Sequence, residues 1–195
     1  EIWSSLVGSE MCIRDRNGLG ISLIQSNYFG IGSRIGVGSY GFFLHNRGCG
    51  FNLIEGHPNS LGPNKKPLHT LSPTIWSKDG SLDFITGTRG GRYQPQLLAQ
   101  TILPYILGES SFEEIMKKPR WTIEYFGSDT SSNIKFEFIE ESEVSSLEKK
   151  GHKISIENKL IGGYGPISTI YKNSDGNFIG VPDIRVGTEK AFNSS

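Results

Sequence analysis

The sequence lacks the charge imbalance and the long apolar runs that direct proteins to nucleic acids or membranes. Its 20 lysines and arginines balance 20 aspartates and glutamates, so the formal net charge at pH 7 is zero. Such a chain offers no electrostatic footprint for a polyanion. The longest apolar run, 97–107, contains Gln100 and Pro104 and is far shorter than the roughly 20 apolar residues that span a bilayer. We therefore expect no nucleic-acid partner and no membrane span in this chain.

Disulfides, metal ligands and nucleotide-binding loops are equally poorly represented. The two cysteines, Cys12 and Cys49, are too few for a disulfide framework and give no indication of the cellular compartment. The four histidines are scattered without the spacing of a zinc site. The segment 36–41 matches G-x-G-x-x-G, but 42–44 has the composition of a strand where a dinucleotide site needs a helix. We therefore expect no metal and no cofactor.

Residues 1–16 do not resemble the start of a domain. They show neither apolar periodicity nor the charged-then-apolar order of a signal peptide, and 4–16 closely resembles a peptide that arises when sequencing-adapter DNA is translated in frame with a genuine fragment. We therefore interpret 1–16, with Cys12, as a non-native leader and leave it out when predicting the fold. Residues 17–192 are expected to form one domain, because 35% hydrophobic content suffices for a core of ordinary size, and 193–195 to form a tail.

Turn, cap and periodicity signals predict an α+β fold. Asp-Gly at 79–80 predicts a hairpin between 74–77 and 82–86, and Ser111 begins a capping box. The order of strands and helices argues against a regular βαβ array and favours antiparallel sheets packed by helices. Further strands are predicted at 21–26, 42–44, 134–139, 153–157, 167–171 and 178–181, and helices at 96–107, 112–116 and 143–150, the last capped by Ser142.

Two groups of charged residues are interpreted as structural. The acidic run 137–143 is expected to be a solvated strand end and loop. Asp183 and Arg185 are expected to make a local pair rather than to catalyse a reaction.

The most informative stretch is the glycine-rich turn 87–92, which follows the predicted strand 82–86 and leads into the predicted helix 96–107. Adjacent glycines at Gly90 and Gly91 allow two backbone N–H groups to point at one spot, an arrangement that stabilises an oxyanion in acyl transfer. On spacing alone, a plain turn between strand and helix is the simpler interpretation.

Several short motifs occur in a fixed order between Asn17 and about Phe192. They are Gln25-Ser26-Asn27-Tyr28, Leu44-His45-Asn46-Arg47-Gly48-Cys49-Gly50-Phe51, Leu71-Ser72-Pro73-Thr74, Gly90-Gly91 before a helix, Lys118-Pro119-Arg120-Trp121 and Pro182-Asp183-Ile184-Arg185. Their order and spacing resemble the small subunit of γ-glutamyltranspeptidases. The resemblance implies part of an αββα sandwich of the N-terminal-nucleophile hydrolase type, made from a precursor that cuts itself and partnered by the large subunit of that precursor.

The same resemblance implies a reaction. In the family, the hydroxyl of a threonine at the start of the small subunit attacks a γ-glutamyl amide, and water or an amine then resolves the acyl-enzyme. The threonine-threonine-histidine start of the family falls at Gly8-Ser9-Glu10 here. The nucleophile is therefore absent from this chain, which we expect to be inactive by itself.

The remaining site residues are carried over position by position. The resemblance makes Gly90 and Gly91 the oxyanion-hole donors. It matches Ser26 to a threonine that hydrogen-bonds near the nucleophile, and Asn27 to an asparagine that helps to hold the substrate. Each of these last two could instead simply terminate a strand.

Two departures from the family pattern bear on the substrate. Arg47 and Gly50 stand where well-studied members carry acidic residues for the substrate α-ammonium, and His69 and Thr70 replace the tandem serines that bind its α-carboxylate. These changes resemble a divergent, cephalosporin-acylase-like branch. Because a guanidinium pairs with carboxylates and not with ammonium groups, we hypothesise that Arg47 anchors an acyl group ending in a carboxylate. The alternative is that Arg47 makes a surface or structural ion pair.

Two other classes of function stay open at this level. The chain could belong to a non-catalytic family member that serves as an assembly or scaffold subunit, or, less favoured, to a stand-alone β domain that binds ligands. Genomic sequence upstream of Asn17 distinguishes them, since only the enzyme requires a large-subunit region followed by Thr-Thr-His.

Overall fold

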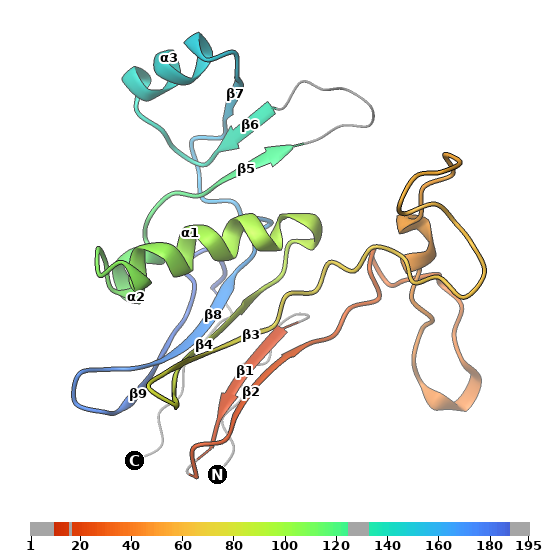
Figure 1. The fold of residues 1–195 in the computed structure, drawn as a ribbon, viewed down its shortest axis with the longest axis horizontal. Coiled ribbons are helices and arrows are strands. Elements are labelled where there is room, and N and C mark those ends of the chain that lie inside the picture. The colour runs from red at the N-terminus through yellow and green to blue at the C-terminus, as the bar shows by residue number, and fades with distance from the viewer. Residues whose placement is uncertain (1–9, 16, 125–132, 188–195) are drawn as a thin grey trace. The chain divides into compact units, whose positions relative to one another are not determined.

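The computed structural model describes residues 10–15, 17–124 and 133–187, and the fold is drawn in Figure 1. The proposed tail at 193–195 lies outside these residues. The chain divides into two compact units, unit 1 with residues 1–24 and 72–195 and unit 2 with residues 25–71. All named strands and α-helices belong to unit 1.

Unit 1 is built around a sheet with the strand order β3-β4-β8-β9, in which every neighbouring pair is antiparallel. Asp79 and Gly80 connect the first pair and have φ of 51° and 75°, the left-handed conformations that a tight type I′ hairpin needs. The predicted hairpin across 79–80 is confirmed. The strands are β3 (Thr74–Lys78), β4 (Ser81–Thr88), β8 (Ile167–Lys172) and β9 (Phe178–Val181).

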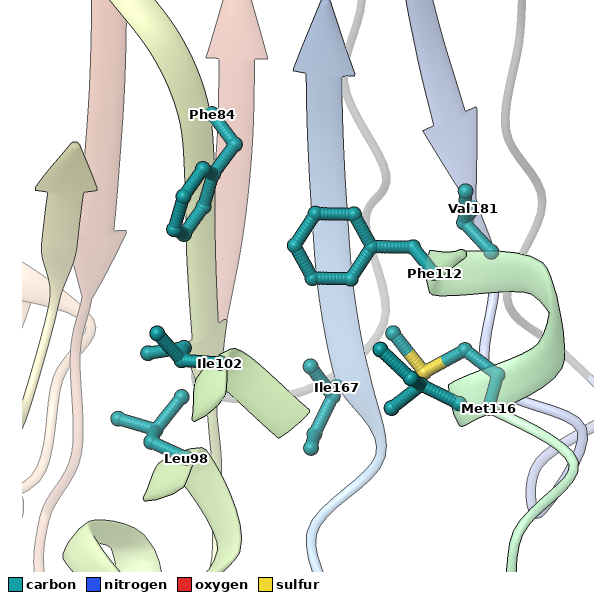
Figure 2. Close-up of a cluster of buried hydrophobic side chains, with 8 residues drawn as sticks. Phe84, Leu98, Ile102, Phe112, Met116, Ile167 and Val181 are labelled. Atoms are coloured by element: carbon teal, nitrogen blue, oxygen red, sulfur yellow. The ribbon is translucent and has the colours of Figure 1, made fainter. Parts of the chain in front are cut away.

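Two helices, α1 (Gln94–Ile106) and α2 (Phe112–Ile115), cover one face of this sheet. The ring of Phe84 on β4 lies 5.3 Å from that of Phe112, centroid to centroid. Figure 2 shows how these rings and the aliphatic side chains interdigitate, and each such buried side chain stabilises the fold by roughly 1.5–3 kcal/mol. The predicted capping box is confirmed at Ser111. The core consists of Phe84, Leu98, Ile102, Phe112, Ile115, Met116, Ile167 and Val181.

The opposite face of the sheet carries the antiparallel hairpin of β1 (Glu10–Arg14) and β2 (Gly20–Ile24). Ile85 points to this face because successive side chains on a strand alternate, and a Cβ on Gly20 would stand 2.8 Å from its Cδ1. Cys12 is buried, and its thiol donates a hydrogen bond to the Ser168 carbonyl at 3.4 Å. Unit 1 therefore has three layers, which are the helices α1 and α2, the four-stranded sheet, and the β1–β2 hairpin.

The strand β1 lies inside the 1–16 segment, which was left out when the fold was predicted from the sequence. It pairs with β2 along its whole length, and Cys12 contributes to the buried interior. The physical reason is that ladder hydrogen bonds join backbone groups, which every non-proline residue carries. A segment without a clear apolar period can therefore still pair.

A smaller sheet in unit 1 has the order β5-β6-β7, with β5–β6 antiparallel and β6–β7 parallel. The α3 helix connects the parallel pair, an exception to the expectation of antiparallel sheets. The N-cap of α3 is Glu140 and not the predicted Ser142. The strand β5 was not predicted from the sequence. The predicted strand at 42–44 reduces to one bridge between Phe43 and Gly36 in unit 2. The elements are β5 (Trp121–Glu124), β6 (Asn133–Phe136), α3 (Glu141–Lys149) and β7 (Lys153–Ile156).

A tyrosine that joins the sheet to α2 makes the stability of the chain sensitive to alkaline pH. Burial, together with the 2.8 Å hydrogen bond to Glu113, raises the pKa of Tyr171 to about 12. Because the folded-state pKa lies above the ordinary value of about 10, this contribution to stability is complete below pH 10 and is lost as the pH rises through about 12. We expect Tyr171→Phe to flatten the loss of stability in that range in urea unfolding, and the exposed Tyr40→Phe not to. Equal alkaline sensitivity of wild type and Tyr171→Phe would contradict this.

Candidate functional site

The turn between β4 and α1 holds the two glycines that the sequence singled out. Gly90 has φ 130° and Gly91 φ 57°, a region that side chains rarely adopt. A Cβ on Gly90 would also lie 3.1 Å from Cδ1 of Leu97. Glycine is thus required by the backbone path itself.

The amide groups of this turn are available to a ligand. Within the described residues, neither the Gly90 N–H nor the Gly91 N–H donates a hydrogen bond to a protein acceptor, although both carbonyls accept bonds from the start of the helix. Gly90 is partly exposed and Gly91 is exposed. Two neighbouring N–H donors without a partner match the chemistry of an oxyanion hole.

The amino end of β1 lies at the end of the sheet where this turn is found. Cys12 bonds to Ser168, which pairs with the last part of β4, while the Arg14 guanidinium lies 3.9 Å from the ring of Phe178, toward the other end. The strand β1 therefore runs away from the turn, and Glu10 begins it about 7 Å beyond Cys12 at about 3.3 Å per residue. The resemblance expects the nucleophile at 8–10. Two residues of this position, Gly8 and Ser9, lie outside the described residues.

Unit 2 brings Ser26, Arg47 and Thr70 together. Arg47 is only 7% exposed, yet its Nη1 donates to the Thr70 hydroxyl at 3.2 Å and its Nη2 to the Ser26 carbonyl at 3.3 Å. Its Cζ lies 5.3 Å from the ring centroid of Tyr28. No carboxylate in the described parts of the chain forms an ion pair with Arg47. Within the described residues, Arg47 is therefore hydrogen-bonded to neutral groups and not ion-paired.

A buried guanidinium without a counter-charge has the chemistry to bind an anion. Removing a charge from water is costly unless it is paired and hydrogen-bonded, and the two neutral acceptors beside Arg47 supply no counter-charge. A planar guanidinium pairs bidentately with a carboxylate. A carboxylate-bearing ligand would therefore restore the charge balance that the protein leaves open.

The other predicted site residues in unit 2 lie nearby in sequence but make fewer contacts. The Ser26 hydroxyl accepts the Tyr28 N–H at 3.0 Å, a local turn of the kind expected where a strand ends. The carbonyl of Asn27 accepts the Asn46 N–H at 3.1 Å, while its side chain has no hydrogen bond within the described region. His69 is exposed.

A buried charge network that the sequence only partly revealed lies in unit 1. The expected pair of Asp183 and Arg185 is confirmed at 3.2 Å. Arg120 also pairs with Asp183, Nη2 to Oδ2 at 2.6 Å, and Arg185 binds Glu137. Glu137 is fully buried, so the expectation that 137–143 is solvated is wrong at this residue. The reason is tertiary, because the C-terminal segment folds over the end of β6 and supplies the counter-charge.

The two arginines of this network respond differently to burial. Burial lowers the pKa of Arg120 below its ordinary value, although the Asp183 charge opposes the shift. Burial also acts to lower the pKa of Arg185, but the hydrogen bond to Glu137 and the Asp183 charge outweigh it, and the pKa is raised. Both guanidiniums stay charged at neutral pH, as arginine does in proteins.

The described residues contain neither a helix long and apolar enough to cross a bilayer nor a group of three or more His, Cys, Asp or Glu side chains placed to hold a metal ion.

Comparison with known proteins gives consistent matches. A family model described as gamma-glutamyltranspeptidase matches residues 8–192. The chain is 30% identical over 176 residues to the oxamate amidohydrolase proenzyme of Klebsiella pneumoniae, covering 90% of this chain and 33% of that protein. It superposes on the cephalosporin acylase of Bacillus halodurans with a TM-score of 0.77 at 28% identity, covering 90% of this chain and 32% of that one.

A third match concerns the fold alone. The γ-glutamyltranspeptidase T380A mutant of Helicobacter pylori superposes with a TM-score of 0.75 at 23% identity, covering 92% of this chain and 100% of that chain. Together with the family match, this confirms the predicted fold class, an α+β fold of the γ-glutamyltranspeptidase type. The chain spans about a third of the length of the curated relatives it matches.

Proposed function

We propose a function from the family of this chain, which belongs to the γ-glutamyltranspeptidases. In this proposal the chain is the C-terminal part of an N-terminal-threonine amidohydrolase or acyltransferase. The intact protein acts on γ-glutamyl, glutathione-type, or related carboxylate-bearing acyl amides through an acyl-enzyme. The large subunit of the same precursor is its partner. The chain alone, which has Gly8-Ser9-Glu10 where the family has its threonine, is inactive.

The observation that carries this proposal is the pair of unpartnered amides at Gly90 and Gly91, located at the end of the sheet where β1 begins. A hydroxyl attacking an amide carbonyl forms a C–O bond while the carbonyl electrons move to its oxygen, and the two N–H groups stabilise that oxyanion. The α-amine of the N-terminal threonine acts as the base that takes the hydroxyl proton. Collapse breaks the C–N bond, the base returns that proton to the leaving amine, and an ester remains. Removing one such donor costs about 3–4 kcal/mol of barrier stabilisation.

The substrate part of the proposal rests on Arg47. Its buried, unpaired guanidinium and the adjacent Thr70 hydroxyl form a binding site for the carboxylate of the acyl group. The Klebsiella relative is named for oxamate, an amide whose acyl group carries a carboxylate. This supports a carboxylate-bearing acyl donor in general.

The test of the reaction class uses the full precursor encoded by the genomic reading frame that contains residues 17–192. We expect self-cleavage into two chains and, with γ-glutamyl or glutaryl anilide, an acyl adduct on the new N-terminal threonine by mass spectrometry. The 195-residue chain serves as the inactive control. A precursor that carries no threonine at the cleavage point, or that stays uncut, would overturn the proposal and favour a non-catalytic assembly subunit.

The carboxylate anchor makes a separate prediction. Truncating one partner of a buried charged hydrogen bond typically costs 2–5 kcal/mol, so Arg47→Ala in the intact protein is expected to lower kcat/KM for glutaryl anilide by on the order of 10²-fold. Hydrolysis of the neutral butyryl anilide should change little. Arg34→Ala, at an exposed arginine of the same unit, is the control. An unchanged ratio between the two anilides would exclude the anchor role.

Exposed apolar side chains support the assignment of a partner. Ile21 and Leu23 on β2 are 40% and 50% exposed and point away from the central sheet. An apolar strand face without cover is typical of a surface that another layer buries. The large subunit, which supplies the rest of the sandwich in this proposal, is the partner assigned to it.

A further inference from the structure

The Arg120 guanidinium is almost fully buried, being 3% exposed, and it holds two consecutive backbone carbonyls. Its Nη1 donates to the carbonyl of Tyr164 at 3.1 Å and to that of Gly165 at 2.7 Å. Its Nη2 pairs with Asp183 at 2.6 Å. The charge of Arg120 is thus balanced within the protein, and its remaining hydrogen bonds fix the path of the loop before β8.

That loop packs against the glycine turn. Gly165 has φ 51°, and a Cβ there would overlap both the Arg89 carbonyl oxygen and Oγ1 of Thr88. A Cβ on Gly90 would in turn lie 3.9 Å from the Gly165 nitrogen. The backbone at Gly165 therefore packs directly against the Arg89–Gly90 peptide.

Hydrogen bonds on both sides of Gly165 complete this support. The Thr88 hydroxyl donates to the Arg89 carbonyl at 2.8 Å, and the Pro166 carbonyl lies 3.4 Å from the same hydroxyl oxygen, so the turn and the loop are in direct contact. Oδ2 of Asp183, the carboxylate that pairs with Arg120, accepts the Ile167 N–H at 2.9 Å. The loop is held at both ends by one ion pair.

We propose that Arg120 is a positioning residue for the oxyanion donors, acting on Gly90 and Gly91 through the carbonyls of Tyr164 and Gly165. This inference rests on the function proposed above for the two glycines. Oxyanion donors are effective only within about 2.7–3.1 Å of the developing charge. A shift of the supporting loop moves the Arg89–Gly90 peptide and lowers kcat, whereas binding of the acyl carboxylate at Arg47 depends on other residues and sets KM.

The test separates positioning from stability with the conservative variant Arg120→Lys in the intact protein. Lysine keeps a positive charge beside Asp183 but lacks the planar fork of N–H donors. We expect kcat per active site, titrated by acyl-enzyme formation, to fall about 10²-fold, with KM within about twofold. Arg92→Lys, at an exposed arginine at the end of the same turn, is the matched control and should match the wild type.

A second variant and a second measurement cover the case that Arg120→Lys does not fold. Arg120→Gln combined with Asp183→Asn removes both charges while keeping polar groups in place. Amide hydrogen exchange at 89–91 is expected to be faster than in the wild type for either variant, in the intact protein and without substrate. Unchanged kcat per titrated site, or unchanged exchange at 89–91, overturns the inference.

The two proposals fail in different ways. If the wild-type precursor forms no acyl-enzyme, the proposed reaction is wrong, and the exchange rates alone then decide whether Arg120 holds the turn. If the wild type acylates and Arg120→Lys loses thermal stability but not kcat per titrated site, Arg120 is structural only and the positioning role is excluded.

Discussion

Glu137→Gln is expected to destabilise unit 1 by about 3–5 kcal/mol, the cost of breaking a buried ion pair by removing one charge. Oε1 of Glu137 accepts the Ile161 N–H and the Arg185 Nε–H, each at 2.7 Å. Oε2 accepts the Arg120 N–H at 2.7 Å and a second Arg185 donor. An amide turns one of these acceptors into a donor that faces other donors and leaves Arg185 without part of its counter-charge.

The size of this effect is large against the total stability of a domain, which is typically 5–15 kcal/mol. Urea unfolding followed by circular dichroism measures it. The matched control is Glu157→Gln, the same substitution at the end of β7, where the carboxylate pairs with Lys135 in a solvent-accessible position. The hydrogen bond from Lys135 lowers the pKa of Glu157, but water screens such a pair, and we expect no measurable change. Equal midpoints for both variants would refute the role given to Glu137.

Elements with a local chemical signal were predictable from the sequence. The hairpin turn at Asp79-Gly80 needs two left-handed residues, and aspartate and glycine tolerate that conformation. The α2 helix begins at Ser111, where the serine side chain and Glu114 satisfy each other's backbone N–H groups. Both signals lie within four residues, so no knowledge of the rest of the fold was required.

Elements defined by distant partners were not predictable. The short strand β5 exists because it pairs with β6, and β1 because it pairs with β2 and packs on the central sheet. The parallel pairing of β6 and β7 depends on the direction of the α3 connection, which residue composition does not specify. In each case the decisive interaction joins segments that the local pattern cannot connect.

The candidate site also combines a feature with a local sequence signal and features that depend on distant contacts. The glycine turn was recognisable because Gly90 and Gly91 are adjacent and follow a strand, whereas the role of Gly165 depends on contacts about 75 residues away along the chain. The sequence also could not distinguish the two buried arginines. Arg120 has Asp183 as its counter-charge, and Arg47 has none among the described residues. This contrast is the basis on which Arg120 is proposed to position the glycine turn and Arg47 to bind a ligand.

Gly165→Ala is the second substitution for which we expect a large effect, because it disturbs both the backbone and the glycine turn. An L-residue in the left-handed region costs about 1–2 kcal/mol, and the added methyl group overlaps the Arg89 carbonyl oxygen, which belongs to the backbone and cannot rotate away. The loop or the turn must move. We expect a lower urea midpoint in the chain itself and, in the intact precursor, strongly reduced acyl-enzyme formation.

Gly163→Ala provides the control within the same loop. Gly163 has no positive φ, and its Cβ would meet only Cγ2 of Ile161 at 3.8 Å, an ordinary contact. An alanine there should leave the urea midpoint unchanged or slightly raised, since replacing glycine restricts the unfolded chain. If both alanines were equally tolerated, the close packing of Gly165 under the turn would not constrain the position of the Gly90 amide. If both were equally harmful, the loop would be sensitive to any side chain, and the specific contact with Arg89 would not explain the loss.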